Sequence, residues 1–468
     1  MLPDGFSGMV DFRFGRGLVA GIVTLAVLGG LLFWGLISIT DSDGRQPALD
    51  LASGRVDTLD APDGALVTVH SDTAPACTTC TVSLWSAGGF GSVDDAILLR
   101  GIPTVEHDSR GRFYATVRYA DDHELIVYDA DGGIVRTVGR SGDGPGEFRS
   151  IWDFALGVND TLYVGHDRRL SVYDSTGQFV RDVTFEPVND PKARLIHVSE
   201  NAIVLTQVLS KYSPDTLALP LHLYDPSGQY VRALGTRGVL GDFSFEHGLL
   251  VGNRKSRLSA AGSVWLKDMQ YQFENLDLDE GVVRRVIGVR TPEEWGLPLF
   301  MTLDELMASI APGQLRRPIA RRPHAGWAAG ERPTERRPTA RPATVVDDFI
   351  ARERSLIVLV HVASTDWADA VVQLDTTRYS NQSISEPGYR QQLYDTMVDV
   401  IDIESGLLLA RSRVPGMLSF TGDGTLYRTS VDELGVINVE AFSLDFNEID
   451  RFRAEAELAR SEVGMYHE

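Results

Sequence analysis

The chain has 468 residues, of which 43% are hydrophobic and 23% are charged, so it can bury the core of one large domain or of two or three average ones. Its formal net charge is −21, and so acidic a surface repels phosphates, which argues against general nucleic-acid binding. Its two cysteines cannot form a disulfide framework, so the hydrophobic core must hold the fold together.

An uncharged apolar run occupies residues 17–39. At about 1.5 Å per residue, it is long enough to cross a hydrocarbon core about 30 Å thick. Arg13 and Arg16 precede the run and Asp41 follows it, and this bias places residues 1–16 in the cytoplasm. We therefore predict a single-pass transmembrane signal-anchor that tethers a periplasmic or extracellular body to the membrane. A long cleaved signal peptide and a buried core helix are the alternatives.

The next segment leads from the membrane to the body of the protein. Residues 40–75 are polar, acidic and rich in Gly, Ala and Asp, which predicts a flexible stalk with at most a stray strand at Ala65–His70. Cys77 and Cys80 follow in a C-x-x-C run, and no second pair completes a four-cysteine zinc site. Outside the cytoplasm a local disulfide is the favoured interpretation, and two unpaired thiols, a redox pair and a metal site are the alternatives.

Three apolar runs with a two-residue period open the body at Phe113–Arg118, Glu124–Tyr128 and Gly133–Val138. A turn of Asp and Gly residues separates the second run from the third, as in a β-hairpin. The same pattern returns along the chain, with turn glycines at Gly132, Gly177, Gly228, Gly281 and Gly406. A period of about 40–50 residues with four strands per repeat is typical of propeller blades.

These repeats predict an all-β fold, a six-bladed β-propeller of four-stranded antiparallel blades over residues 76–446, preceded by the transmembrane helix. The blades are expected near residues 102–138, 152–184, 193–235, 250–290, 346–412 and 414–446. The sixth contains only three strands, and we expect Ala96–Arg100 to supply its missing outer strand and to close the ring without a free sheet edge. Five or seven blades are the alternatives.

Tyr128–Gly132 reads Tyr-Asp-Ala-Asp-Gly, and the glycine-rich run Gly139–Phe148 follows it. Together they resemble the NHL-type propeller repeat, and still more closely the six-bladed propeller proteins of bacterial envelopes. The short cysteine pair ahead of the first blade also resembles that group of proteins. The resemblance covers about residues 76–446 and implies the fold and an envelope location, but little about function. The glycine run lacks the Lys-Ser/Thr ending of a phosphate loop, so we interpret it as the crossover between blades one and two, with Phe148 packed between them.

Two segments interrupt or follow the blades. Residues 291–346 form an insertion, with a short predicted helix at Thr302–Ile310 and an Arg- and Pro-rich part at 312–342 that is expected to be disordered. This basic part is either an arm that binds an anionic partner or a surface insertion that the fold tolerates. Residues 447–468 are expected to form a polar C-terminal tail.

Long connections gather on one face of the predicted ring. In an antiparallel blade, the loops between second and third strands share a face with the blade-to-blade links. The long ones here are Gln207–Pro220, Lys267–Gln272, Ala363–Tyr394 and Arg290–Val346. The opposite face has tight turns such as Asp129–Gly132. Since binding sites tend to lie where long loops sit on a rigid scaffold, we expect any ligand on the long-loop face.

Acidic, histidine and arginine side chains of this face are the weak binding candidates: Asp121, Asp122, His123, His166, Asp167, Arg168 and Asp268. Oxygen and imidazole groups from several blades could hold Ca²⁺ or Zn²⁺ at the mouth of the central channel. These residue types are also ordinary in loops, so we assign no cofactor and keep the channel-mouth metal as an alternative.

No nucleophile motif such as G-x-S-x-G is present and no pair of carboxylates stands out, so we assign no catalytic residue and do not favour an enzyme. We predict a binding or scaffold module that is held at the membrane through residues 17–39 and presents its long-loop face to a protein, peptide or glycan. A metal-dependent hydrolase or lyase at the channel mouth, and a structural envelope protein without a small ligand, are the alternatives.

Overall fold

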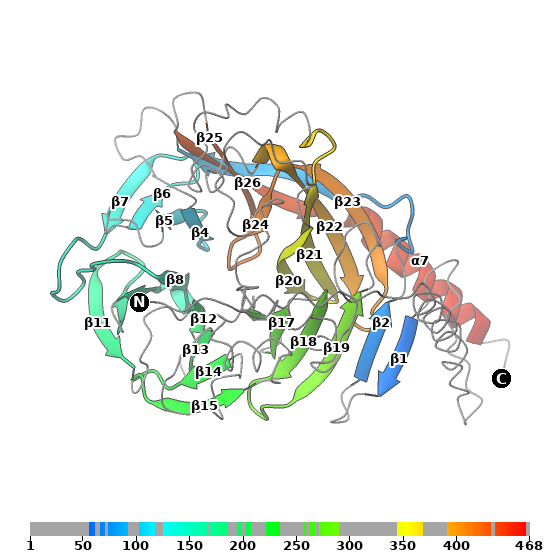
Figure 1. Ribbon diagram of the computed structural model, residues 1–468, viewed down its shortest axis with the longest axis horizontal. Helices are drawn as coiled ribbons and strands as arrows, with labels where there is room; N and C mark the ends of the chain where they lie inside the picture. The colour runs from blue at the N-terminus through cyan, green and yellow to red at the C-terminus, as the bar shows by residue number, and fades with distance from the viewer. Residues whose placement is uncertain are drawn as a thin grey trace, which may run out of the picture. The chain divides into compact units, whose positions relative to one another are not determined.

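Six antiparallel blades surround a common axis in the computed structural model (Figure 1). Contacts divide the chain into residues 1–50 and 51–468, and the described residues all belong to the second unit. The structure describes residues 56–60, 66–70, 74–91, 103–117, 125–166, 169–185, 194–198, 202–206, 221–234, 256–258, 263–267, 271–289, 344–367, 391–431 and 436–464.

The first three blades use consecutive strands, counted from the axis to the rim. Blade one contains β4 (Pro103–His107), β5 (Phe113–Val117), β6 (Leu125–Tyr128) and β7 (Ile134–Val138). Blade two contains β8 (Asp153–Leu156), the 3-10 helix η1 (Val158–Asp160), β9 (Leu162–His166), β10 (Arg169–Tyr173) and β11 (Phe179–Thr184). Blade three contains β12 (Arg194–Val198), β13 (Ile203–Thr206), β14 (Leu221–Tyr224) and β15 (Tyr230–Leu234).

The remaining blades follow the same order, except that the last one takes its rim strand from an earlier part of the chain. Blade four contains β16 (Ser256–Leu258), β17 (Ser263–Lys267), β18 (Gln272–Asp277) and β19 (Val283–Val289). Blade five contains β20 (Val345–Arg352), β21 (Ser355–Ala363), β22 (Tyr394–Asp402) and β23 (Leu408–Pro415). Blade six contains β24 (Leu418–Phe420), β25 (Leu426–Val431), β26 (Ile437–Asp445) and β3 (Ser83–Phe90). The predicted count of six four-stranded blades is confirmed.

The innermost strands meet in sequence around the axis. β4 contacts β8, β8 contacts β12, and the series continues through β16 and β20 to β24. Hydrogen bonds between blade one and the β24–β25 turn complete the circle. Figure 1 shows β4, β8, β12, β20 and β24 facing the centre, with β7, β11 and β15 on the rim.

The hydrophobic core lies between the blades. Among the described residues, buried side chains form six clusters, and each cluster joins one blade to the next. Phe148 illustrates the arrangement, because its fully buried ring packs with Tyr114 and Leu125 of blade one and with Phe154 and Leu162 of blade two. Burial of one such ring contributes about 1.5–3 kcal/mol relative to leaving it exposed. The predicted role of Phe148 as a plug between blades one and two is confirmed.

The turn between the third and fourth strands repeats from blade to blade. In blade two, Oδ1 of Asp174 accepts the backbone N–H groups of Thr176 (2.9 Å) and Gln178 (3.0 Å). Asp129 and Asp225 make the same pair of bonds in blades one and three. A glycine at positive φ closes each turn, which a residue with a Cβ adopts only with strain.

An arginine four residues after the turn glycine joins neighbouring blades on this same face. Arg136 of blade one donates to the carbonyl of Ser175 (3.2 Å), and Arg181 of blade two donates to that of Pro226 (3.0 Å). Equivalent bonds continue the series around the ring: Arg232 to Asp279 (2.8 Å) and Arg285 to Glu404 (2.6 Å). Each arginine therefore anchors its rim strand to the turn of the next blade.

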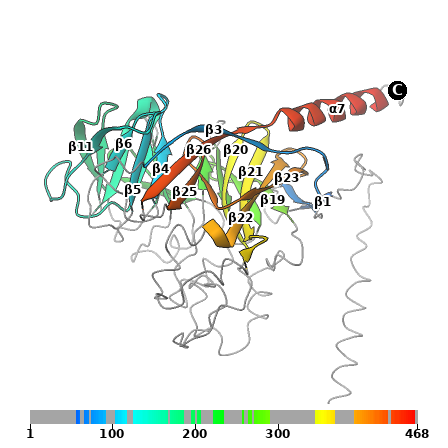
Figure 2. The same ribbon diagram turned by 90° about the horizontal axis from the view of Figure 1, so that it is seen from above.

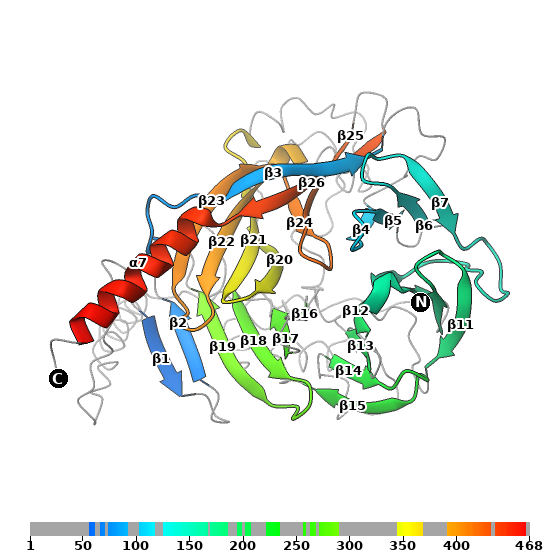
Figure 3. The same ribbon diagram turned by 180° about the vertical axis from the view of Figure 1, so that it is seen from behind.

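The segment before blade one lies along the rims of the last three blades. β1 (Val56–Asp60) and β2 (Leu66–His70) form a hairpin, and β2 pairs in parallel with β19 of blade four. The backbone of residues 76–77 then donates to the carbonyls of residues 408–409 in blade five. β3 finally pairs antiparallel with β26 of blade six (Figure 3). We call residues 56–90 the rim strap.

A C-terminal helix, α7 (Asn447–Gly464), packs its first turns on the rim strap. Oε2 of Glu448 accepts the backbone N–H (2.8 Å) and the hydroxyl (3.1 Å) of Thr81, and Ile449 is buried in the core between blades five and six. The later turns of α7 extend beyond the blades (Figure 2), where Leu458 is exposed. The polar tail predicted at 447–468 is thus helical over most of its length.

Two expectations for the rim need correction. The outer strand of blade six is Ser83–Phe90 rather than Ala96–Arg100, which lies outside the described residues. The predicted flexible stalk at 40–75 contains two paired strands, β1 and β2, because the edge of β19 provides hydrogen-bond partners for the backbone of β2. A single stray strand was expected there.

The predicted membrane segment at 17–39 and the insertion at 312–342 lie outside the described residues. Within the described part, no helix combines the length and the apolar character that a membrane crossing requires.

Candidate functional site at the propeller axis

Of the candidates predicted from the sequence, only His166 lies in the described part of the chain. Asp121, Asp122, His123, Asp167, Arg168 and Asp268 lie outside it. His166 ends β9 and is fully buried, with its ring edge-on to Phe148 at 4.8 Å between centroids. It is therefore a core residue of blade two and does not stand in an exposed loop.

The hydrogen bonds of His166 assign it a structural role. Its Nε2 lies 2.7 Å from Oγ of Ser171, which donates its own proton to Oδ1 of Asp182 at 2.5 Å. Because a hydroxyl has one proton, Nε2 of His166 must be the donor to Ser171. A histidine that donates to a serine cannot act as the base that activates it, so these three residues do not form a catalytic triad.

No metal centre is found in the described part of the chain. No group of three or more His, Cys, Asp or Glu side chains is arranged there to hold an ion. The channel-mouth Ca²⁺ or Zn²⁺ was predicted to involve residues that, except for His166, lie outside the described ranges, so it stays a prediction.

Charged side chains instead gather at the axis, on the innermost strands of four blades. We call them the axial charge cluster: Glu106, Asp153, Arg257 and Asp348. Nη2 of Arg257, from β16, lies 2.9 Å from Oδ2 and 3.1 Å from Oδ1 of Asp348 on β20. The same Nη2 donates to the carbonyl of Phe420 on β24 at 3.1 Å, so one guanidinium joins blades four, five and six.

Asp348 is the most tightly held member of the axial charge cluster. It is almost fully buried, and its carboxylate accepts the backbone N–H groups of Phe349 (2.9 Å) and Phe420 (3.2 Å) in addition to Arg257. Charge-assisted hydrogen bonds of this kind are shorter and stronger than neutral ones. Asp348 therefore joins the inner strands of blades four, five and six at the axis.

Glu106, on β4, is the member whose charge can change near neutral pH. Burial raises its pKa to about 7, and the positive charge of Arg257 and the hydrogen bond from the backbone N–H of Gly422 offset only part of that effect. The negative charges of Asp153 and Asp423 raise it further. Carboxyl groups with such perturbed pKa values concentrate at functional sites, although buried ion-pair networks show them too.

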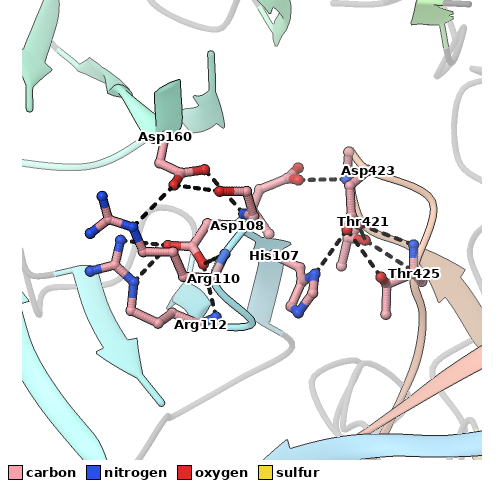
Figure 4. Close-up of polar contacts among 11 residues, drawn as sticks. His107, Asp108, Arg110, Arg112, Asp160, Thr421, Asp423 and Thr425 are labelled. Carbon is pink, nitrogen blue, oxygen red and sulfur yellow. Dashed lines mark hydrogen bonds and ion pairs between the residues drawn. The ribbon is translucent and has the colours of Figure 1, made fainter. Parts of the chain in front are cut away.

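The next residue on β4 forms a second contact with blade six. Nδ1 of His107 lies 2.8 Å from Oδ2 of Asp423, and Figure 4 shows the two side chains facing one another across the seam between the blades. The hydrogen bond to Asp423 raises the pKa of His107, against the opposing effect of partial burial. Partial burial acts to raise the pKa of Asp423, but bonds from His107, Thr421 and the Thr425 backbone outweigh it and lower that pKa.

The turn after β4 links blade one to blade two. The backbone N–H and Oγ of Ser109 donate to the two carboxylate oxygens of Asp160, at 3.0 and 2.8 Å. Asp108, buried in the same turn, accepts from the backbone of Arg112 (2.9 Å) and pairs with its Nη2 (2.6 Å), as Figure 4 shows. Glu106, His107 and the turn that follows them thus contact both neighbouring blades.

Sequence reasoning missed the axial charge cluster, although a signal was present. Glu106, Arg257 and Asp348 are charged residues inside the first strand of a blade, and each has an apolar residue next to it in the sequence: Val105, Leu258 and Phe349. A charge at this place in a blade points to the axis, and the same place in several blades brings the charges together.

Comparisons with known proteins support the fold. A model of the family described as DUF5128, 6-bladed beta-propeller, matches residues 93–208. The match includes blades one and two and the first two strands of blade three, which is less than half of the chain. No curated protein matches the chain.

Solved structures with a similar arrangement share little sequence with this chain. A Bacteroides fragilis protein described as exported is 9% identical, with 78% of this chain and 95% of that one covered and a TM-score of 0.48. A Bacteroides caccae protein of unknown function is 11% identical (66% and 80% covered, TM-score 0.35), as is Kuenenia stuttgartiensis hydrazine synthase (72% and 76% covered, TM-score 0.35). At such values the likeness carries no argument about activity or partners.

Proposed function

We propose that this protein is an extracytoplasmic binding module that takes a protein, peptide or glycan on one face of the propeller. The single observation that carries the proposal is the unequal length of the connections on the two faces. We call the face of the second-to-third-strand loops and blade links the long-connection face, and the opposite one the tight-turn face.

The strand bounds define the asymmetry. On the long-connection face, residues 207–220, 235–255, 290–344 and 364–393 join successive strands. On the tight-turn face, the joining residues are short runs such as 108–112, 129–133, 157–161 and 225–229. Long connections tend to carry binding residues when a rigid scaffold holds their ends.

The scaffold beneath the long-connection face is suited to hold such loops in place. The buried clusters between all neighbouring blades and the arginine bonds on the tight-turn face oppose relative motion of the blades. Binding then requires little reorganisation of the ring, so less interaction energy is lost on ordering it.

The same proposal includes an extracytoplasmic location and a single-pass membrane anchor at residues 17–39. It also includes a relationship to the NHL-type propeller proteins of bacterial envelopes. The bond between Cys77 and Cys80 supports it, because disulfides persist in oxidising compartments. The test is alkylation of intact protein taken directly from cells. We expect no alkylated cysteine before reduction and two afterwards, whereas free thiols in cells would contradict this location.

Site-specific photo-crosslinking in intact cells tests the binding face. Two exposed aspartates give matched positions: Asp366, in the connection after β21 on the long-connection face, and Asp131, in a turn on the tight-turn face. We expect a crosslinker at position 366 to capture a specific partner and one at position 131 to capture none. Equal capture at both positions, or capture at 131 alone, would contradict the proposal.

A further inference from the structure

Blades one to five share a β-bulge at the start of their fourth strand. The register between the third and fourth strands shifts there by one residue, and the extra residue is always the third one after the turn glycine. Such a residue stands outside the regular ladder of backbone pairs. The bulge residues are Val135, Val180, Val231, Arg284 and Leu409.

The bulge of blade five is a docking point for the rim strap. The backbone N–H groups of Ala76 and Cys77 donate to the carbonyl oxygens of Leu408 (2.8 Å) and of the bulge residue Leu409 (3.0 Å). The side chain of Leu409 is only 5% exposed, and it packs in one hydrophobic cluster with Cys77 and Cys80. A polypeptide segment therefore binds this bulge through its backbone and covers the bulge side chain with apolar atoms.

The equivalent bulges of blades two and three are exposed. Val180 is 56% exposed and Val231 is 52% exposed, although both are apolar, as the bulge residue of blade five is. The rim strap is already held on the last three blades, by pairing of β2 with β19, by its bonds to blade five and by pairing of β3 with β26. An occupant of the two exposed bulges would therefore come from another molecule.

An aromatic residue precedes each of these two bulges and is itself exposed. Phe179 in β11 contacts Tyr173 edge-on, with 5.9 Å between ring centroids, and Tyr230 in β15 contacts Tyr224 in the same way at 5.7 Å. Aromatic side chains that are already held in place are effective anchors for a partner, because little conformational entropy is lost on binding. Blade one has Ile134 at this place, so the aromatic pair distinguishes blades two and three.

The charged side chains of the two rim strands already make contacts within the ring. β11 and β15 are the terminal strands of their sheets, and charges on such strands commonly protect a free edge. Here Arg181 and Arg232 each donate to a backbone carbonyl in the following blade, and Asp182 accepts from the hydroxyl of Ser171 at 2.5 Å. These contacts leave the apolar side chains to determine what the two rims bind.

We propose that the bulges of blades two and three form a second docking surface, which binds an apolar segment of another polypeptide as blade five binds the rim strap. We call Phe179, Val180, Tyr230 and Val231 the rim docking surface. Backbone N–H groups of the partner donate to the carbonyls of these residues, and its apolar side chains cover the two valines. β11 and β15 lie on the rim (Figure 1), so this surface is separate from the long-connection face and does not depend on a partner there.

A peptide of the rim strap is the probe that tests the proposal. A fluorescently labelled peptide of residues 74–84, with its disulfide formed, contains the donors and the apolar atoms that bind blade five. Its Kd for the full chain is measured by fluorescence anisotropy with the wild type, with the double variant Val180→Asp/Val231→Asp and with the control Val158→Asp. Val158 is exposed to a similar extent but lies in η1 on the tight-turn face.

We expect saturable binding to the wild type, the same Kd for the control, and a Kd at least about tenfold weaker for the double variant, because carboxylates replace the apolar atoms that the peptide covers. Thermal unfolding should give the same Tm for all three proteins, since the substituted side chains are exposed. A photo-crosslinker at position 180 of the otherwise unchanged chain should attach the peptide, and one at position 158 should not.

Three results would overturn the proposal. The first is the absence of saturable peptide binding to the wild type. The second is an equal Kd for all three proteins, or equal crosslinking at positions 180 and 158, as expected if the peptide only displaces the rim strap from blade five. The third is a dimer of the wild type that the double variant dissociates, because the surface would then bind a second copy of this chain.

Discussion

Arg136 donates from Nη2 to the carbonyl oxygen of Ser175, 3.2 Å away in the turn of the next blade. The bond is the first of four that recur at equivalent places around the tight-turn face. Each joins a charged donor to a backbone acceptor and so exceeds an ordinary neutral bond in strength.

Arg136→Ala should lower the free energy of unfolding by about 1.5–3 kcal/mol, because it removes a charge-assisted bond between two blades and the aliphatic stem that supports it. Chemical denaturation measures the change. Arg149→Ala is the matched control, since its ion pair with Asp143 lies on the surface and should make no measurable difference. Equal effects of the two substitutions would show that the inter-blade bond adds nothing.

A buried ion pair within blade five, which also accepts a hydrogen bond from blade four, should be far more sensitive. Asp399 is fully buried, accepts from Arg411 Nε (2.7 Å) and Nη2 (2.6 Å), and accepts from the Tyr271 hydroxyl (2.6 Å). Asp399→Ala leaves the Arg411 charge buried without this partner, at a cost of about 3–5 kcal/mol. Tyr271→Phe removes one bond and should cost about 1 kcal/mol. Denaturation midpoints that rank the two variants in the other order would refute this account of the pair.

Alanine substitutions at two turn glycines test the cost of backbone strain and the cost of a steric clash separately. A Cβ on Gly228 would lie 2.3 Å from the carbonyl oxygen of Thr184, whereas a Cβ on Gly111 would meet only the methyl of Ala130 at 3.7 Å. Both residues have positive φ. Gly111→Ala should therefore cost about 1 kcal/mol from backbone strain alone, and Gly228→Ala about 1–3 kcal/mol more. Thermal unfolding of the two variants tests the ranking, and a larger loss for Gly111→Ala would contradict it.

Only the last part of the rim strap, strand β3, should be essential for a closed and monodisperse propeller. A chain that begins at residue 92 lacks β3, which exposes the edge of β26 and removes Phe90, whose ring stacks on Tyr128 at 4.1 Å between centroids. We expect this chain to aggregate, because an unpaired apolar edge is a template for association. A chain that begins at residue 76 keeps β3 and should stay monodisperse in size-exclusion chromatography. Similar behaviour of both chains would show that β3 does not close the ring.

The sequence predicted the blades well and the rim poorly, for a physical reason. Strands such as Leu125–Tyr128 are buried, so their apolar residues make a clear pattern with turn glycines between them. Ser83–Phe90 is an outer strand whose side chains are mostly exposed, so its residues need not be apolar and Gly and Ser are tolerated. Its place in the fold comes from backbone pairing with β26, which leaves little mark on the sequence.

The C-terminal helix and the axial charge cluster were missed for different reasons. Of the α7 side chains that the structure describes, Ile449 alone is fully buried, so this part of the helix has no strong amphipathic pattern. Glu106, Arg257 and Asp348 are far apart in the chain, and their proximity depends on how the blades are arranged around the axis. The sequence also shows an arginine four residues after the turn glycine in several blades. Its role follows only from the structure, because its hydrogen-bond acceptor belongs to the neighbouring blade.

The affinity for the partner captured at position 366 tests the central claim most directly. Its Kd is measured for the wild type and for three chains in which residues 208–219, 291–343 or 368–390 are replaced by a short Gly-Ser linker, with Asp131→Arg on the tight-turn face as the control. A binding module on the long-connection face predicts at least a tenfold weaker Kd, about 1.4 kcal/mol, for one or more of the three replacements and no change for the control. An unchanged Kd for all three, or a loss with Asp131→Arg alone, would contradict it.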